Sequence, residues 1–230
     1  MSDPATARRT AAALGLVGVA VLTTVSVYLD PAPPQATTAL LQHLAQVGPR
    51  GELAIALFTL AQLPFFAAVL GIGHLLRRGA PRLATVGAAF GVVGAFGHAV
   101  WGGASLSFVA MAHDQTHRDV FVPVVNTIKS SPPTLFSLAG LIGTVVGILL
   151  LSIGLLRAHV GPRWVPPVLW AFLLIEFLGA AITGYASLVS TVLGAVAFLT
   201  LARVAIHSPR ALWTNGYDAT THTADAPATA

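Results

Sequence analysis

Residues 164–202 read WVPPVLWAFLLIEFLGAAITGYASLVSTVLGAVAFLTLA, a run of 39 residues with no basic side chain and one acid, Glu176. One helix of this length would extend about 58 Å at about 1.5 Å per residue. About 20 apolar residues already cross the roughly 30 Å of hydrocarbon in a bilayer. The run therefore predicts two membrane spans, over residues 164–183 and 188–206, that fold back on each other near residues 184–187.

Four further stretches are also nearly free of charge, and each is long enough for one span. They predict helices over residues 9–29, 53–76, 83–106 and 134–156. The composition agrees, because 55% of the residues are hydrophobic and only 9% are charged, against about 25% charged in ordinary globular domains. An open sheet would leave backbone groups unpaired in lipid. The predicted fold class is all-α, a polytopic membrane helix bundle with six transmembrane helices.

Two long connections, residues 30–52 and 113–133, each predict a short amphipathic helix on the outer side of the bundle. Apolar residues recur there at helical spacing: Leu40, Leu41, Leu44 and Val47 in the first, and Phe121, Val124, Val125 and Ile128 in the second. Two interpretations stay open. These helices are packed connectors, or they form a lid over a cavity that opens outward.

Basic residues divide unequally between the two sides of the bundle. Nine arginines lie on the side of the termini, and only Arg50, Arg118 and Lys129 lie on the other. Since cytoplasmic loops carry an excess of Lys and Arg, this distribution places both termini in the cytoplasm. It also accounts for the pI near 10.3 without nucleic-acid binding. The predicted organisation is a cytoplasmic tail over residues 1–7, a single transmembrane domain over residues 8–206 and a disordered cytoplasmic tail over residues 207–230.

Polar side chains inside hydrocarbon are the strongest indication of function, because ionisable groups are costly there. Counting along the predicted helices places Glu176, His98 and Gln62 at similar depth, near the middle of the bilayer. Trp101 lies about one turn from His98, and Thr183 follows Glu176 by seven residues on the same helix face. These residues form either hydrogen-bonded contacts between helices or a site that anchors a ligand, an ion or a proton.

Glycines recur on two of the predicted helices. They are Gly87, Gly91 and Gly94 on the helix over residues 83–106, and Gly140, Gly147 and Gly154 on the helix over residues 134–156. Small residues let helix backbones approach closely in lipid. The glycines therefore predict close packing, either within the bundle or between the subunits of a homo-oligomer.

Several chemistries are excluded by composition and motifs. The chain has no cysteine, which removes disulfides, thiolate catalysis and thiol-ligated clusters. It has no HExxH or GxSxG motif, and its one lysine, Lys129, lies in an outer connection rather than in a Walker motif. His98 has no second histidine at matching depth that could share a haem. The sequence therefore predicts neither a metal site nor a cofactor.

A first span, a Pro-rich connection that leads into the helix ALLQHL (residues 39–44) and the basic turn LLRR (residues 75–78) form a layout over residues 8–206. In this layout the chain resembles uncharacterised bacterial six-helix integral membrane proteins that are grouped as a domain of unknown function. With the bias toward Ala, Gly, Val and Arg, the resemblance implies a protein of the bacterial inner membrane. It assigns no functional residue.

Three functions from different classes follow. The first is a module that binds a lipid or small apolar molecule, or transports an ion or proton, with Glu176 and His98 as polar anchors. The second is a membrane-embedded enzyme that acts on a lipid or isoprenoid with Glu176 as acid or base; it ranks lower because such enzymes use more than one acid. The third is a structural subunit of a membrane complex.

Overall fold

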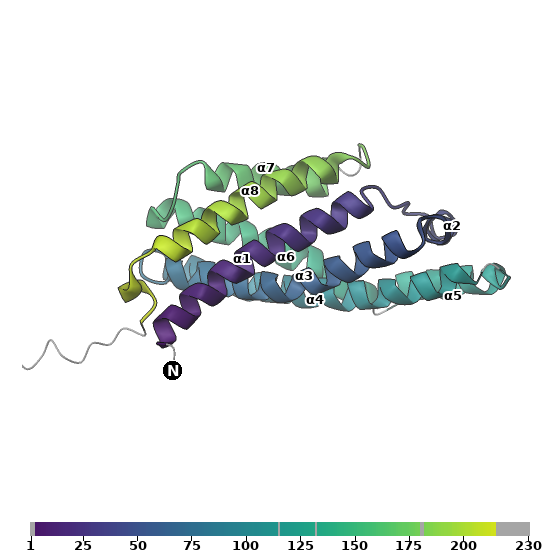
Figure 1. Ribbon diagram of the computed structural model, residues 1–230, viewed down its shortest axis with the longest axis horizontal. Helices are drawn as coiled ribbons and strands as arrows, with labels where there is room; N and C mark the ends of the chain where they lie inside the picture. The colour runs from purple at the N-terminus through teal and green to yellow at the C-terminus, as the bar shows by residue number, and fades with distance from the viewer. Residues whose placement is uncertain (1–2, 115, 132, 180–181, 215–230) are drawn as a thin grey trace, which may run out of the picture.

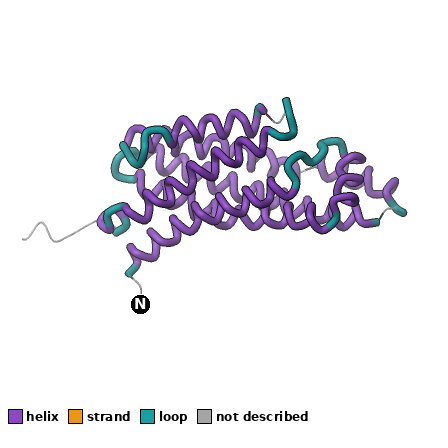
Figure 2. The backbone as a smooth tube through the Cα atoms, turned by 45° about the horizontal axis from the view of Figure 1, so that its top comes forward, coloured by secondary structure: helices purple, strands orange, loops and turns teal. Residues whose placement is uncertain are grey.

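The computed structural model describes residues 3–114, 116–131, 133–179 and 182–214, which contain helices and connections and no strand (Figure 2). Its elements are α1 (Pro4–Leu29), α2 (Thr37–Val47), α3 (Pro49–Leu76), α4 (Pro81–His113), α5 (Arg118–Ser130), α6 (Pro133–Ala158), α7 (Val165–Phe177), α8 (Ala186–His207) and the 3-10 helix η2 (Arg210–Leu212). The long helices run along the long axis of the molecule (Figure 1). Helices α2 and α5 lie at one end, and the start of α1 and the end of α8 lie at the other.

Five helices are long and apolar enough to cross a membrane: α1, α3, α4, α6 and α8. The protein is therefore a polytopic helical membrane bundle. Helix α7 is apolar but has only 13 residues, about 20 Å at about 1.5 Å per residue. The prediction of six full spans is corrected in this respect: the described residues contain five long apolar helices and a sixth, shorter one.

The predicted span over residues 164–183 is too long because the chain turns back earlier. Helix α7 ends at Phe177, six residues before the predicted end. Gly179 follows two residues later, and a Cβ built on it would lie 3.0 Å from the Cβ of Ala186 at the start of α8. The missing side chain of Gly179 thus lets the two helices meet in a tight turn.

Helix α4 continues beyond the membrane-crossing part of the bundle. It has 33 residues, about 50 Å at about 1.5 Å per residue, against roughly 30 Å of hydrocarbon. The end of α4 forms a separate small core with α2 and α5: Leu41, Leu44, Phe108, Val109, Ala112 and Val125. The two short helices expected in the outer connections are therefore present, and with the end of α4 they form what is here termed the cap.

Helices α4 and α6 touch through their backbones. A Cβ on Gly97 would lie 2.3 Å from the carbonyl oxygen of Phe136, and one on Gly143 would lie 2.4 Å from the nitrogen of Gly94. The predicted packing glycines (Gly87, Gly91, Gly94, Gly140, Gly147 and Gly154) are all buried against neighbouring helices of the same chain. Their faces leave no surface for a second copy, so a homo-oligomer built through these glycines is not supported.

The segment over residues 208–214, which the sequence places in a disordered tail, packs on the end of the bundle where α1 begins. The Trp213 ring is 1% exposed and stacks on the ring of His74 with a centroid distance of 5.0 Å. The guanidinium groups of Arg77 and Arg78 donate hydrogen bonds to the carbonyl oxygens of Leu212 and Ala211 at 3.1 and 3.2 Å. Residues 208–214 therefore pack against the helix bundle, whereas residues 215–230 of the predicted tail lie outside the described residues.

The first helix begins earlier than the sequence predicts. Helix α1 begins at Pro4, inside the predicted tail over residues 1–7, and Ala5 is already buried. Asp3 caps the helix, and its carboxylate lies 2.8 Å from the guanidinium of Arg210. The hydrogen bond from Arg210 holds the pKa of Asp3 below its usual value. The two ends of the described chain are thus joined to each other.

Trp213→Ala is expected to lower the free energy of unfolding by about 3 kcal/mol, because replacing a buried Trp with Ala leaves a large cavity. Thermal unfolding in detergent, with an added titration of denaturant, measures the change. Trp164→Ala is the matched control, since Trp164 is 45% exposed. Equal losses in the two variants would show that the packing of Trp213 does not stabilise the bundle.

Candidate functional site

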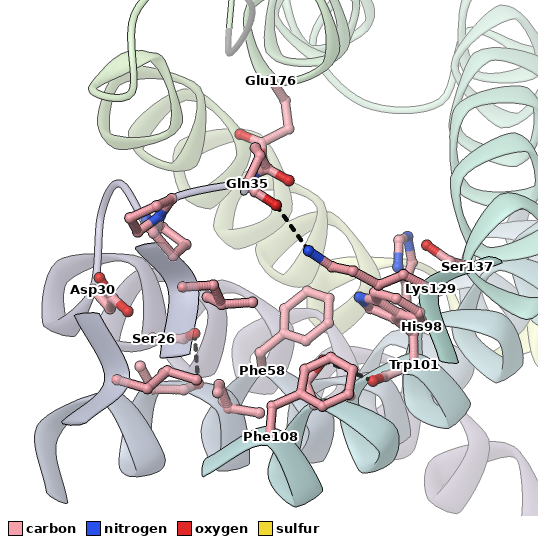
Figure 3. A pocket seen from close by; sticks show the side chains of 18 residues that line it. Ser26, Asp30, Gln35, Phe58, His98, Trp101, Phe108, Lys129, Ser137 and Glu176 are labelled. Carbon is pink, nitrogen blue, oxygen red and sulfur yellow. Dashed lines mark hydrogen bonds between the residues drawn. The ribbon is translucent and has the colours of Figure 1, made fainter. Parts of the chain in front are cut away.

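Two neighbouring cavities lie between the helices beneath the cap. The outer cavity has a volume of about 480 Å³ and reaches Leu40 of α2 and Lys129 of α5. The inner cavity has a volume of about 240 Å³ and lies between α1, α3, α4, α6, α7 and α8. Phe58, His98 and Glu176 line both cavities. These three side chains therefore lie at the boundary between the two cavities. Figure 3 shows them in the outer cavity.

His98 owes its position to the glycines of α4 and α6. A Cβ on Gly140 would lie 3.0 Å from Nδ1 of His98 and 2.9 Å from its backbone nitrogen, so only glycine leaves room for the ring there. On the other side, the ring packs edge-on against Phe58 with a centroid distance of 5.6 Å. Neither ring nitrogen has a hydrogen-bond partner among the described residues. Nδ1 faces Gly140 closely, and the ring as a whole lines both cavities without a hydrogen bond to the described protein.

Glu176 is held between α7 and α8. It is the penultimate residue of α7, and its Oε2 accepts a hydrogen bond from the hydroxyl of Ser190, which is fully buried in α8. Within the described parts of the chain the other carboxylate oxygen has no partner, and no ion pair joins Glu176 to His98. The two residues thus face the same space without contacting each other.

The other predicted site residues divide into two groups. Gln62 is buried and lines the inner cavity, and its Nε2 donates a hydrogen bond of 2.9 Å to the carbonyl oxygen of Phe58. Trp101 lines the outer cavity and packs edge-on against Phe108. Thr183 lines neither cavity; it is exposed in the connection after α7, because that helix ends before reaching it. Its predicted place on the face of Glu176 is wrong.

Lys129 and Asp30 also line the outer cavity, and the sequence analysis did not identify either as a site residue. The Lys129 ammonium donates a hydrogen bond of 2.8 Å to the carbonyl oxygen of Gln35, and partial burial lowers its pKa. The Asp30 carboxylate lies 2.9 Å from Nε2 of His43. The only lysine of an apolar chain is a visible signal, but nothing in the spacing indicates that α5 brings it over the bundle.

The site is closed on the side away from the cap. One turn below the inner cavity, the helices contribute fully buried apolar side chains, among them Leu16, Val69 and Leu201. Among the described residues, no group of three or more His, Cys, Asp or Glu side chains is placed to hold a metal ion. The arrangement is a pocket that combines a charged outer part with an apolar inner part.

Comparison with protein-family models, with curated proteins and with solved structures finds no match to this chain. The structure supports the layout of a multi-helix membrane protein.

Proposed function

We propose that this protein binds a small molecule in the two cavities beneath the cap, with Glu176 and His98 as the polar anchors. The observation that carries the proposal is that both residues line both cavities and keep unpaired polar atoms there. A purely structural pair would satisfy these atoms with each other, because an unpaired buried polar group costs free energy. The volume of the outer cavity is also in the usual range of ligand sites, about 300–1,000 Å³.

The closed side of the site favours binding over passage through an open channel. Leu16, Val69 and Leu201 fill the bundle below the inner cavity, so buried apolar side chains block a continuous path for an ion or proton there. Transport would require a second conformation in which these side chains separate. The proposed activity is therefore ligand binding. Transport would need that second conformation in addition to the binding site.

A second candidate function, a membrane-embedded enzyme acting on a lipid or isoprenoid, gains support from Asp30. The sequence offers only Glu176 as an acid within the membrane helices, whereas the outer cavity is lined by both Glu176 and Asp30. Two carboxyl groups in one cavity can serve as general acid and general base. Asp30 is already paired with His43, so binding remains the first proposal.

Identifying co-purified molecules tests the proposal. The protein is purified in mild detergent, and its bound lipids and small molecules are extracted and compared by mass spectrometry with those of an unrelated membrane protein from the same cells. We expect one class of molecule to be enriched with the wild type and reduced with His98→Ala. Extracts identical to those of the unrelated protein would overturn the proposal and favour a structural subunit.

We further propose that the protein lies in the bacterial inner membrane with both termini cytoplasmic. The α3–α4 turn lies at the same end of the bundle as the start of α1, and α5 lies at the opposite end (Figure 1). Reporter fusions after Arg78 and at the C-terminus are therefore expected to give cytoplasmic signals, and a fusion after His117 a periplasmic signal. A cytoplasmic signal at His117 would reverse the orientation.

A further inference from the structure

Two opposite charges stand in the outer cavity without pairing. An ammonium has three donors, and Lys129 uses two, toward the carbonyl oxygen of Gln35 and the hydroxyl of Thr37. Glu176 uses one oxygen, toward Ser190. In the described residues no ion pair joins Lys129 to Glu176. Figure 3 shows Gln35 between them.

Their separation is built into the fold. Lys129 of α5 is held within the cap, by the carbonyl oxygen of Gln35 in the connection into α2 and by the hydroxyl of Thr37 at the start of α2. Glu176 is held from the α7–α8 hairpin. Because the two groups are fixed to different elements, Lys129 keeps one donor and Glu176 keeps one carboxylate oxygen without a partner among the described residues. A ligand that carries both an anionic and a cationic group satisfies both.

The remaining charged groups of the cavity do not change this balance. Asp30 is paired with His43 at 2.9 Å. His98 offers its ring nitrogens close to the boundary between the cavities. A purely anionic ligand would leave Glu176 without a partner, and a purely cationic ligand would leave Lys129 without one. The site therefore favours a zwitterion.

The inner cavity is suited to an apolar chain. Its aromatic lining consists of Phe58, Phe65, Phe172, Phe177 and Phe198. Of its buried polar groups, the Gln62 amide donates to the backbone of its own helix, whereas the Thr144 hydroxyl has no hydrogen-bond partner among the described residues. A hydrocarbon chain gains from burial in such a space, whereas a polar group would lose hydrogen bonds to water.

The outer cavity also lies close to lipid. Ser137 lines it, while the neighbouring Leu135 and Leu138 at the same end of α6 are 66% and 48% exposed. Helix α7 ends at Phe177, one residue after Glu176. The cavity thus borders the apolar surface of α6 beside the end of the short helix, where an amphiphile could enter from the outer leaflet.

We infer that the site takes a single-chain amphiphile with a zwitterionic head group. Lys129 binds its anionic group, Glu176 binds its primary ammonium, and its chain lies among the phenylalanines of the inner cavity. This inference rests on the proposed function and specifies its ligand class.

Four probes separate the contributions of head and chain. They are lauroyl lysophosphatidylethanolamine, its lysophosphatidylcholine and lysophosphatidic acid counterparts with the same chain, and free phosphoethanolamine. Native mass spectrometry of the full-length protein in detergent measures their binding. We expect the ethanolamine lysolipid to bind about tenfold more tightly than the other two lysolipids, since a hydrogen bond between charged groups has that effect. Free phosphoethanolamine is expected to bind most weakly.

Charge variants test the two head-group contacts. Glu176→Gln is expected to make the affinity for lysophosphatidylethanolamine equal to that for lysophosphatidic acid. A loss of packing alone would not produce this change. Lys129→Gln is expected to weaken the binding of all three lysolipids about tenfold, because all three carry the phosphate that Lys129 binds. Glu52→Gln and Arg50→Gln are the controls, because they remove one acid and one cation at the start of α3, outside both cavities.

A chain variant tests the inner cavity. Ala195→Phe places a ring in the space lined by Ala195, whereas Val196→Phe places one on the exposed face of the same helix. We expect the first to weaken lysolipid binding and the second to leave it unchanged.

The outcomes are distinguishable. Equal binding of the three lysolipids, or tight binding of free phosphoethanolamine, would overturn the inferred ligand class and leave the binding function standing. A wild-type protein that binds no probe and co-purifies with no molecule would overturn both. Retained ethanolamine preference in Glu176→Gln would overturn the assignment of the ammonium to Glu176.

Discussion

Glu176→Gln is expected to leave a folded bundle with a largely empty cavity. Glutamine keeps the length of the side chain and an oxygen that can accept the hydrogen bond from Ser190, so the α7–α8 contact survives. What disappears is the charge. A hydrogen bond to a charged group contributes about 1.5–3 kcal/mol, so occupancy by the co-purified molecule should fall about tenfold or more, with a change of only a few degrees in the unfolding temperature.

The double variant with His98→Ala makes the prediction sharper. Both residues line both cavities, so they are expected to act on the same bound molecule and their effects should not add. The ligand occupancy of the double variant should be no lower than that of whichever single variant binds less ligand. Glu52→Gln, at the start of α3, is the control for the same chemical change. Wild-type occupancy in Glu176→Gln would reduce Glu176 to a contact between α7 and α8.

Gly97→Ala is expected to prevent α4 and α6 from packing. The new Cβ would lie 2.3 Å from the carbonyl oxygen of Phe136 and 2.4 Å from the nitrogen of Gly140. Both atoms belong to backbone and cannot rotate away, so the helices must separate. Overpacking of this kind costs about 1–3 kcal/mol and more where backbone is involved, and His98 next in sequence should be displaced with it. Lower yield, a lower unfolding temperature and loss of the ligand are the expected results.

Gly103→Ala is the matched control for this variant. It lies on the same helix, and a Cβ built on it meets no atom within 4 Å. Because alanine favours a helix over glycine by about 1 kcal/mol, the control should be neutral or slightly more stable. If Gly97→Ala unfolded at the same temperature as this control, the close contact between α4 and α6 would be disproved.

The membrane helices could be predicted because the bilayer leaves the chain few alternatives. Backbone groups in hydrocarbon must pair within a helix, so a long apolar run and its ends largely determine α1, α3, α4, α6 and α8. Helix α7 shows the limit of this argument. Hydropathy continues through Leu178 and Ile182, and the helix ends where Gly179 packs on Ala186. That contact joins the connection after α7 to the start of α8, and the hydropathy of the sequence does not indicate it.

The difference between patterns within one helix and contacts between distant segments also explains which site residues could be predicted. Counting residues along a helix gives depth, and it brought His98, Glu176, Gln62 and Trp101 to the cavities. Thr183 was misplaced because the count continued past the end of α7. Lys129 was missed because its contact with Gln35 joins residues 94 positions apart. Depth follows from periodicity, whereas the return of α2 and α5 over the bundle depends on how the cap folds.

Helix α4 carries both His98 of the site and three residues of the cap core, Phe108, Val109 and Ala112, on one unbroken helical rod. His98 and Ala112 are separated by 14 residues of continuous helix, about 21 Å. The rod is fixed at its middle by backbone contact with α6, so the cap cannot lift by bending there. Release of a molecule from the outer cavity toward the cap side must then proceed by unpacking α2 or α5 from the rod, or by tilting the rod as a lever about the contact between Gly97 and Gly140. In the second case a small shift at the histidine becomes a larger displacement of the cap.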